Sequence, residues 1–441
     1  MRRLPAAAVR TAAITLSVAV ALVLLGGVLG RTPEASPAAA DEAAAATAVS
    51  AADRLEQSIT RAQDQLRRVP GDWRTWAGLG LAYLERARVT TDPTWYPKAE
   101  EAVGRSLRIH PDGNTEALTA QGALANARHD FVAARRHGLA AVASNRYHAE
   151  AYAVLADAET QLGNARAATA AIQRLLDLRP GLSAYARASY DLEQRGRTDQ
   201  ARELMTRALA AAVDRSDLAF CRTQLGDLAF NSGDLATAEV EYAAGLAADP
   251  ASVALRRGQA RVAAAVGRTG DALAGYAALT WQSPTPGHLI EYAELLRAAG
   301  RDAEARAQLT LAVAGHELFR ANGGIDGLTG AALAEATGQP ATALREARAE
   351  WSRRTHVDVA DALGWALHLS NRDKEALPYA RRAFATGARS ATYAYHLGII
   401  EKSLGDRTAA RAHLTLALDL NPYFSPLAAG SARRALTELG S

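Results

Sequence analysis

The feature that most constrains this chain is a residue suited to a left-handed backbone, which recurs once every few tens of residues. Glycine adopts this conformation freely and asparagine tolerates it, so a helix can end there and the chain can reverse sharply. The positions are Gly163, Gly196, Gly233, Gly267, Gly300, Gly338 and Gly405, with Asn371 and His129 at the equivalent places of two further units. Each unit is therefore predicted to be a helix, a tight turn and a second helix.

An alanine lies five residues after each of these turns. The unit that precedes the His129 turn has an alanine at the equivalent position as well. The aligned residues are Ala99, Ala134, Ala168, Ala201, Ala238, Ala272, Ala305, Ala343, Ala376 and Ala410. A methyl side chain lets two helices approach closely. Each hairpin also carries an apolar stripe that it cannot bury alone, whereas stacked hairpins bury it continuously. The sequence therefore predicts an all-α fold, an α-solenoid of about ten stacked antiparallel helical hairpins.

Several units share a signature beyond the turn. Trp76, Leu79, Gly80 and Tyr83 reproduce the pattern W-x2-L-G-x2-Y, and the same register places Leu397-Gly398, Ala410, Leu414 and Pro422 in the last unit. The chain thus resembles the tetratricopeptide repeat family over about residues 70–424. The resemblance implies a superhelix whose concave surface binds protein or peptide partners. The preference for arginine over lysine, with the segment described next, indicates an exported or membrane-anchored bacterial type.

The N-terminus has the pattern of an export signal. Arg2, Arg3 and Arg10 precede residues 11–30, which contain no charged residue and would form a helix of about 30 Å. This charge asymmetry predicts that the chain beyond residue 30 is extracytoplasmic. Ala38-Ala39-Ala40 suits cleavage and the length of the apolar run suits an anchor, so both a secreted and a membrane-anchored form remain open.

These patterns divide the chain into five parts. We expect a signal peptide or membrane anchor at 1–30, an Ala/Pro-rich disordered linker at 31–47, a capping half-repeat at 48–70, the repeat array at 71–424 and a capping helix at 425–441. The half-repeat is predicted to contain a helix at 50–68. Ser425-Pro426 supplies an N-cap and a first-turn proline for the last helix, expected at 427–439.

Composition argues against two classes of function. The formal charge is +3, but the whole excess precedes Asp41, and the remaining charges balance. A nucleic-acid binder needs a clustered basic surface, so no nucleic-acid partner is expected. Cys221 is the only cysteine, which excludes an intramolecular disulfide, and its position within a predicted helix favours a small buried apolar residue over a nucleophile.

No catalytic, cofactor-binding or metal-binding site is predicted. His316-Glu317 begins a zinc-helix motif, but Arg320 stands where the second histidine is required. The sequence also lacks a nucleophile elbow, a phosphate-binding loop and a dinucleotide fingerprint. The leading hypothesis is a non-enzymatic scaffold or adaptor. A small-ligand or glycan-binding solenoid is the alternative, and an enzyme with an unrecognised site is a third.

The resemblance implies where a partner would bind. In this family the groove is lined by recurring positions of the first helix of each hairpin, and carrying these positions over gives thirteen candidates. Arg257 and Arg261 would suit a partner carboxylate, and the alternative is that several of the thirteen are packing residues. The candidates are Phe220, Asp227, Phe230, Arg257, Arg261, Glu294, Arg297, Asp361, Trp365, His368, Tyr395, Ile399 and Lys402.

The first hairpin has about seven extra residues between its helices, around 89–98. They include Trp95 and Tyr96. Two interpretations apply to this insertion. Either it forms a lip beside the ligand, or the two aromatic rings pack over the open end of their own hairpin.

Overall fold

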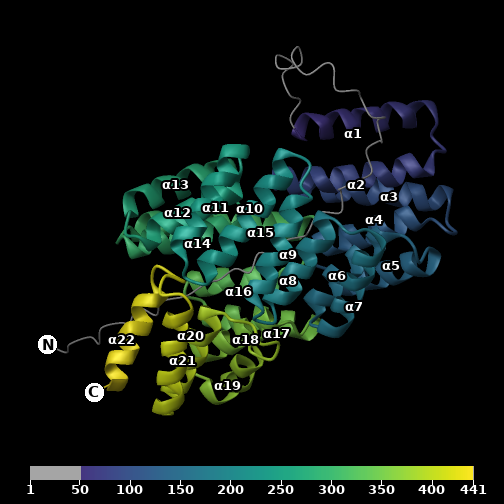
Figure 1. Ribbon diagram of the computed structural model, residues 1–441. Coiled ribbons are helices and arrows are strands. Elements are labelled where there is room, and N and C mark those ends of the chain that lie inside the picture. Colours follow the sequence, from purple (N-terminus) through teal and green to yellow (C-terminus); the bar gives the residue numbers. More distant parts are fainter. Residues whose placement is uncertain (1–50, 441) are drawn as a thin grey trace.

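The computed structural model describes residues 51–440, and every regular element in that range is a helix (Figure 1). Ten antiparallel hairpins follow one another between a first helix, α1 (Ala51–Arg68), and a last helix, α22 (Ala428–Gly440). The predicted all-α solenoid of about ten hairpins is confirmed. The hairpins are α2 (Trp73–Thr90) with α3 (Tyr96–Ile109), α4 (Thr115–Ala127) with α5 (Phe131–Ser144), α6 (Ala149–Leu162) with α7 (Ala165–Leu178), α8 (Leu182–Glu193) with α9 (Thr198–Ala210), α10 (Arg215–Asn231) with α11 (Leu235–Ala248), α12 (Val253–Ala265) with α13 (Thr269–Gln282), α14 (Pro286–Ala298) with α15 (Asp302–Ala321), α16 (Gly327–Ala336) with α17 (Pro340–Arg353), α18 (Val357–Leu369) with α19 (Asp373–Arg382), and α20 (Ala391–Ser403) with α21 (Arg407–Leu420).

The hairpin turns have the predicted left-handed backbone. All seven glycines have positive φ, and φ is 57° at Asn371 and 61° at His129. The residue after the turn then often begins the next helix. Asp130, Asp234 and Asp406 each accept a hydrogen bond from the backbone N–H three residues later, which satisfies a free donor in the first helical turn. The turn and the helix start are therefore specified together by two adjacent residues.

The two helices of a hairpin pack closely, as their small residues require. Each of the ten aligned alanines is at most 1% exposed. In the last hairpin a Cβ atom added to Gly398 would lie 2.8 Å from the Cγ atom of Leu414. Larger side chains at these positions would force the helices apart, so the recurring glycine and alanine set the spacing within each unit.

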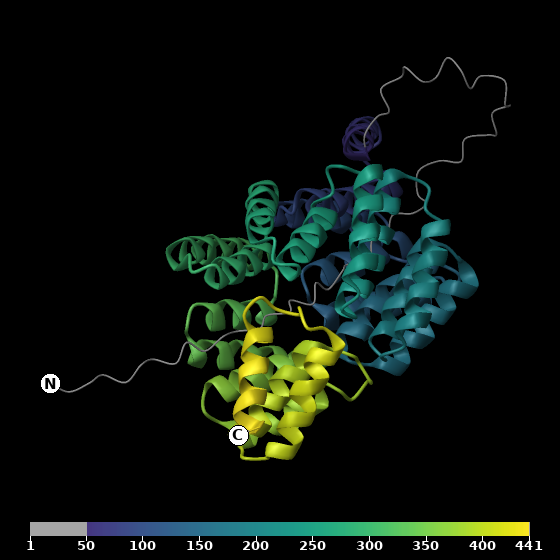
Figure 2. The ribbon, with the colours of Figure 1, turned by 60° about the vertical axis from the view of Figure 1, so that its left-hand side comes forward.

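The hairpins wind into two stacked coils. We call α2–α11 the first coil and α12–α21 the second coil. Hairpin turns of the first coil lie on the loops that join hairpins of the second coil. The backbone N–H of Ile325 donates to the carbonyl of Arg128 (2.8 Å), and the N–H of Thr355 donates to the carbonyl of Leu162 (3.3 Å). In Figures 1 and 2 the helices α16–α19 accordingly lie beside α6–α9, although they are far apart in sequence.

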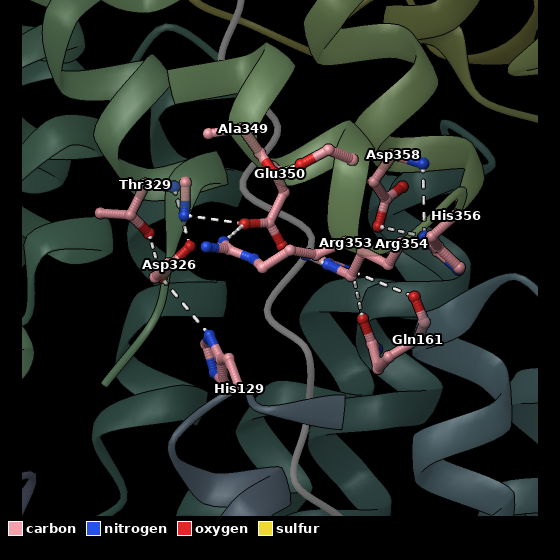
Figure 3. Close-up of polar contacts among 12 residues, drawn as sticks. His129, Gln161, Asp326, Thr329, Ala349, Glu350, Arg353, Arg354, His356 and Asp358 are labelled. Atoms are coloured by element: carbon pink, nitrogen blue, oxygen red, sulfur yellow. Dashed lines mark hydrogen bonds and ion pairs between the residues drawn. The ribbon is translucent and has the colours of Figure 1, made fainter. Parts of the chain in front are cut away.

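Polar side chains fix the contact between the coils (Figure 3). Glu350 is 1% exposed and accepts a hydrogen bond from Arg354 Nε. Arg354 Nη1 then donates to Gln161 Oε1 of the first coil at 2.7 Å. Nearby, His129 Nδ1 of the first coil lies 3.7 Å from Asp326 Oδ2 of the second coil. Because buried polar groups tolerate few alternative partners, this network holds the two coils in one register.

A single helix lies at each end of the described range. The helix expected at 50–68 is α1, and the helix expected at 427–439 is α22. Among the helices of residues 51–440, none has the length and apolar composition to cross a membrane. The predicted signal or anchor at 1–30 and the linker at 31–47 lie outside the described residues.

Candidate binding cavity

Stacking of the coils turns the concave surface of the solenoid into a cavity. Its volume is about 2320 Å³, and residues from α1 through α20 line it. Most of the lining comes from the first helix of each hairpin, because these helices face the inside of the superhelix. We call this space the central cavity. A smaller cleft of about 500 Å³ lies against it, between α8, α10, α12, α14 and the loop before α22.

Eight of the thirteen sequence-predicted residues line one or both of these spaces. Those facing the central cavity are Phe220, Asp227, Arg257, Asp361 and Trp365. The smaller cleft adds Phe230, Arg261 and Glu294. The structure therefore places five of these side chains on the central cavity and three on the smaller cleft alone. Whether any of them contacts a partner stays a prediction.

The other five predicted residues line neither space. Arg297 donates to the carbonyl of Ala336 (2.7 Å), and His368 Nδ1 lies 2.5 Å from Asp373 Oδ1. The remaining three, Tyr395, Ile399 and Lys402, lie in the last hairpin, where they pack in the cluster under α22 or pair with it.

The last helix explains this difference. Tyr395 is 3% exposed and its ring packs on Phe424, while Lys402 Nζ donates to Glu438 Oε2 at 2.5 Å. In the last hairpin, α22 covers the face that the next hairpin buries in the preceding units. For these side chains the packing alternative describes the structure.

One wall of the central cavity is built from charges that neutralise one another. We call it the paired wall, formed by α10, α12 and α14. Arg257 donates two hydrogen bonds to Glu291, at 2.8 and 2.6 Å, and Arg261 Nη1 donates to Asp227 at 3.0 Å. Burial alone would raise the pKa of Glu291, but Arg257 lowers it to about 2. A partner carboxylate at Arg257 or Arg261 would have to compete with these internal pairs.

A second wall carries carboxylates that are not paired with an arginine. We call it the open wall, formed by α16, α18 and α20. Glu335 accepts from Trp365 Nε1, and His396 Nδ1 lies 2.9 and 3.0 Å from the two oxygens of Asp361. Trp365 and His396 stack with ring centroids 4.1 Å apart. Among the described residues, no arginine or lysine forms an ion pair with Glu335 or Asp361.

Sequence reasoning missed Glu335 and His396. The family register selected Tyr395, the neighbour of His396, because Tyr395 lies three residues before Gly398 just as Asp361 lies three residues before Gly364. A usable signal was the repeat period itself, since Asp227 and Arg261 are 34 residues apart and Asp361 and His396 are 35 apart. Complementary side chains one repeat apart on facing helices meet across the hairpin interface.

The cavity as a whole is acidic. Its lining includes eleven carboxylates and six arginines, although the charges of the chain beyond residue 40 balance. Aromatic and apolar side chains such as Phe220, Phe319 and Trp365 share the surface. This arrangement can hold an extended segment that presents both apolar anchors and positive charge.

Cys221 and His316, which the sequence analysis considered for catalysis or metal binding, are both buried. Cys221 is fully buried in α10, and burial raises the pKa of its thiol to about 12, as expected of a packing residue. His316 is 8% exposed, and burial lowers its pKa. Within residues 51–440, no group of three histidine, cysteine or acidic side chains is arranged to hold a metal ion.

In the insertion of the first hairpin, each of the two interpretations holds for one of the two aromatic residues. It forms a short 3-10 helix, η2 (Pro93–Trp95), ahead of α3. Trp95 packs on Tyr83 of its own hairpin, with ring centroids 5.6 Å apart. Tyr96 instead lines the central cavity and meets Phe319 of the second coil edge-on.

One hairpin of the array matches a known protein family. Residues 391–424 match the profile of the family described as tetratricopeptide repeat. No curated protein matches the sequence.

Solved structures with a similar fold include three of different origin. A tetratricopeptide repeat protein from Parabacteroides merdae is 16% identical, with 59% of this chain and 99% of that chain covered and a TM-score of 0.35. Human IFIT1, as a dimer with PPP-AAAA, is 14% identical over 76% and 78%, with a TM-score of 0.46. Yeast Tom70 is 14% identical over 88% and 86%, with a TM-score of 0.38. The ten hairpins thus form an α-solenoid, and its last hairpin, at residues 391–424, matches the tetratricopeptide repeat.

Proposed function

We propose that this chain is a non-enzymatic scaffold or adaptor that holds a protein or peptide partner in its central cavity. Tetratricopeptide arrays are in general protein-interaction scaffolds, and the finer assignment depends on one observation. The inner helices of nearly all hairpins surround a single space of about 2320 Å³ that presents aromatic and charged side chains together. Such a surface offers anchors for an extended segment and polar groups that orient it.

Site-specific photo-crosslinking in the native host tests this proposal. A benzoylphenylalanine at position 220, on the cavity surface, is expected to capture one discrete partner. The matched control places the same group at Trp281 of α13, which is 89% exposed. Capture from position 281 but not from position 220 would assign binding to the outer surface and defeat the proposal.

We also propose that the array works outside the cytoplasmic membrane. The support is the sequence of residues 1–30, in which three arginines precede an uncharged run long enough to cross a bilayer. An alkaline phosphatase fused after Ser441 is expected to be active, because this reporter folds only after export. An inactive phosphatase fusion beside an active cytoplasmic β-galactosidase fusion would contradict the location.

A further inference from the structure

The open wall of the central cavity has carboxylates but, among the described residues, no arginine or lysine that pairs with them. Glu335, Asp361 and His396 all line the cavity. Their polar contacts are to Trp365 and to one another, and no arginine or lysine of the described residues pairs with them. On the paired wall, by contrast, Glu291 is satisfied twice by Arg257. A buried carboxylate without a cation is costly, so the open wall is suited to receive one.

His396 gives a second and independent indication. The residue is 3% exposed, and its Nε2 atom has no hydrogen-bond partner in the described structure. Nδ1 faces the two oxygens of Asp361, which accept hydrogen bonds, so Nδ1 is the nitrogen that bears the proton when the ring is neutral. In that tautomer Nε2 has a free lone pair and is an acceptor. Buried polar atoms are normally paired, so an orphaned acceptor marks a place for a donor from outside the chain.

We propose that Glu335, Asp361 and His396 bind the guanidinium group of an arginine in the partner segment. The inference rests on the proposed function and names the chemistry of the partner. A guanidinium offers five N–H donors in a planar fork, which suits acceptors supplied by three different helices. A lysine ammonium carries the same charge on one nitrogen and satisfies fewer of these acceptors. The excess of carboxylates over arginines around the cavity draws such a segment in.

The bound arginine also changes the protonation of the wall. Burial raises the pKa of Glu335 to about 7, with Asp361 adding to the rise and His396 and Trp365 opposing it. An arriving cation stabilises the carboxylate, so the site releases protons when it is filled near neutral pH. Calorimetry in two buffers of different ionisation enthalpy measures that release.

The test uses the full-length chain in detergent and three acetylated, amidated dodecapeptides of alternating leucine and a second residue. That residue is arginine, lysine or citrulline, which keeps the shape of arginine without its charge. We expect the arginine peptide to bind at least tenfold more tightly than the citrulline peptide, with lysine between them. Glu335→Gln should weaken the arginine peptide at least fivefold, leave the citrulline peptide unchanged and abolish proton release.

Glu85→Gln is the matched control, because Glu85 also lines the cavity but is already paired with Arg88. It should alter binding less than twofold. Equal losses in the two variants would show general attraction and overturn the site. Equal affinity of the arginine and citrulline peptides would overturn it while leaving a peptide-binding cavity. If no peptide binds, the arginine site is wrong, and crosslinking from position 220 still decides the proposed function separately. Should Glu335→Gln fail to fold, Asp361→Asn replaces it with the same expected loss.

Discussion

Glu291 and Glu335 are carboxylates on two walls of one cavity, yet their surroundings shift their pKa values in opposite directions. Both are largely buried. Arg257 lowers the pKa of Glu291 to about 2, whereas burial without a compensating arginine leaves that of Glu335 at about 7. The repeat architecture supplies both positions from equivalent helices, so the difference lies in the side chains alone. On the paired wall the charged side chains pair with one another across neighbouring hairpins. On the open wall hydrogen-bond acceptors stay available for a ligand.

The strongest test of this contrast removes the cation of the paired wall. Arg257→Ala leaves Glu291 buried with only the hydroxyl of Tyr276 at 3.0 Å. Breaking a buried ion pair from one side costs about 3 to 5 kcal/mol of unfolding free energy, measured by urea denaturation. Arg301→Ala is the control, since its pair with Glu304 is exposed and screened by solvent, and removing it should cost far less stability. A loss at Arg257 no larger than the control would mean that the two walls do not differ in this way.

The second test asks whether stacking of the coils encloses both walls. Gly196 and Gly405 have the same left-handed backbone, with φ of 69° and 84°. An alanine Cβ at Gly405 would meet nothing within 4 Å, whereas at Gly196 it would collide with the carbonyl oxygen of Gly387 in the second coil. Both substitutions incur the left-handed penalty of about 1 to 2 kcal/mol. Gly196→Ala must also move backbone, so we expect a total loss of about 3 kcal/mol.

Urea denaturation of the two glycine variants measures this difference directly. If the two variants lose the same stability, the turn at Gly196 is not pressed against the second coil. The cavity would then be an open groove, and the two walls would not face a common space.

The sequence predicted what depends on local backbone chemistry. A left-handed residue followed by a capping aspartate specifies a turn within a few residues, so the hairpin at Gly233-Asp234 needs no distant information. The contact of Arg354 with Gln161, 193 residues away, is different. It arises from small rotations accumulated over several hairpins, and no single repeat encodes that sum.

The same distinction applies to the candidate site. Asp361 and Trp365 were found because the family register fixes which side of an inner helix faces the concave surface. Tyr395 follows the same register but is covered by α22, whose docking depends on where the array ends. His396 was missed for the complementary reason, since its role depends on a partner one repeat earlier.

The third test compares the pH dependence of the two walls. A carboxylate whose pKa is raised by folding binds its proton more tightly in the folded chain. Its contribution to stability is full below the ordinary pKa and is lost as pH rises towards the folded value. For Glu335 that window runs from about pH 4.5 to 7. Glu335→Gln cannot ionise, so relative to wild type it should gain roughly 2 kcal/mol between pH 5 and pH 8.

Glu291→Gln is the informative control, because the lowered pKa of Glu291 places its window below about pH 4.5. The stability of this variant relative to wild type should therefore stay constant between pH 5 and pH 8, however large the offset is. Urea midpoints taken at half-unit steps of pH separate the two profiles. Parallel profiles for both variants would mean that Glu335 is already ionised and compensated, and the acceptors of the open wall would then have no need of a cation from a partner.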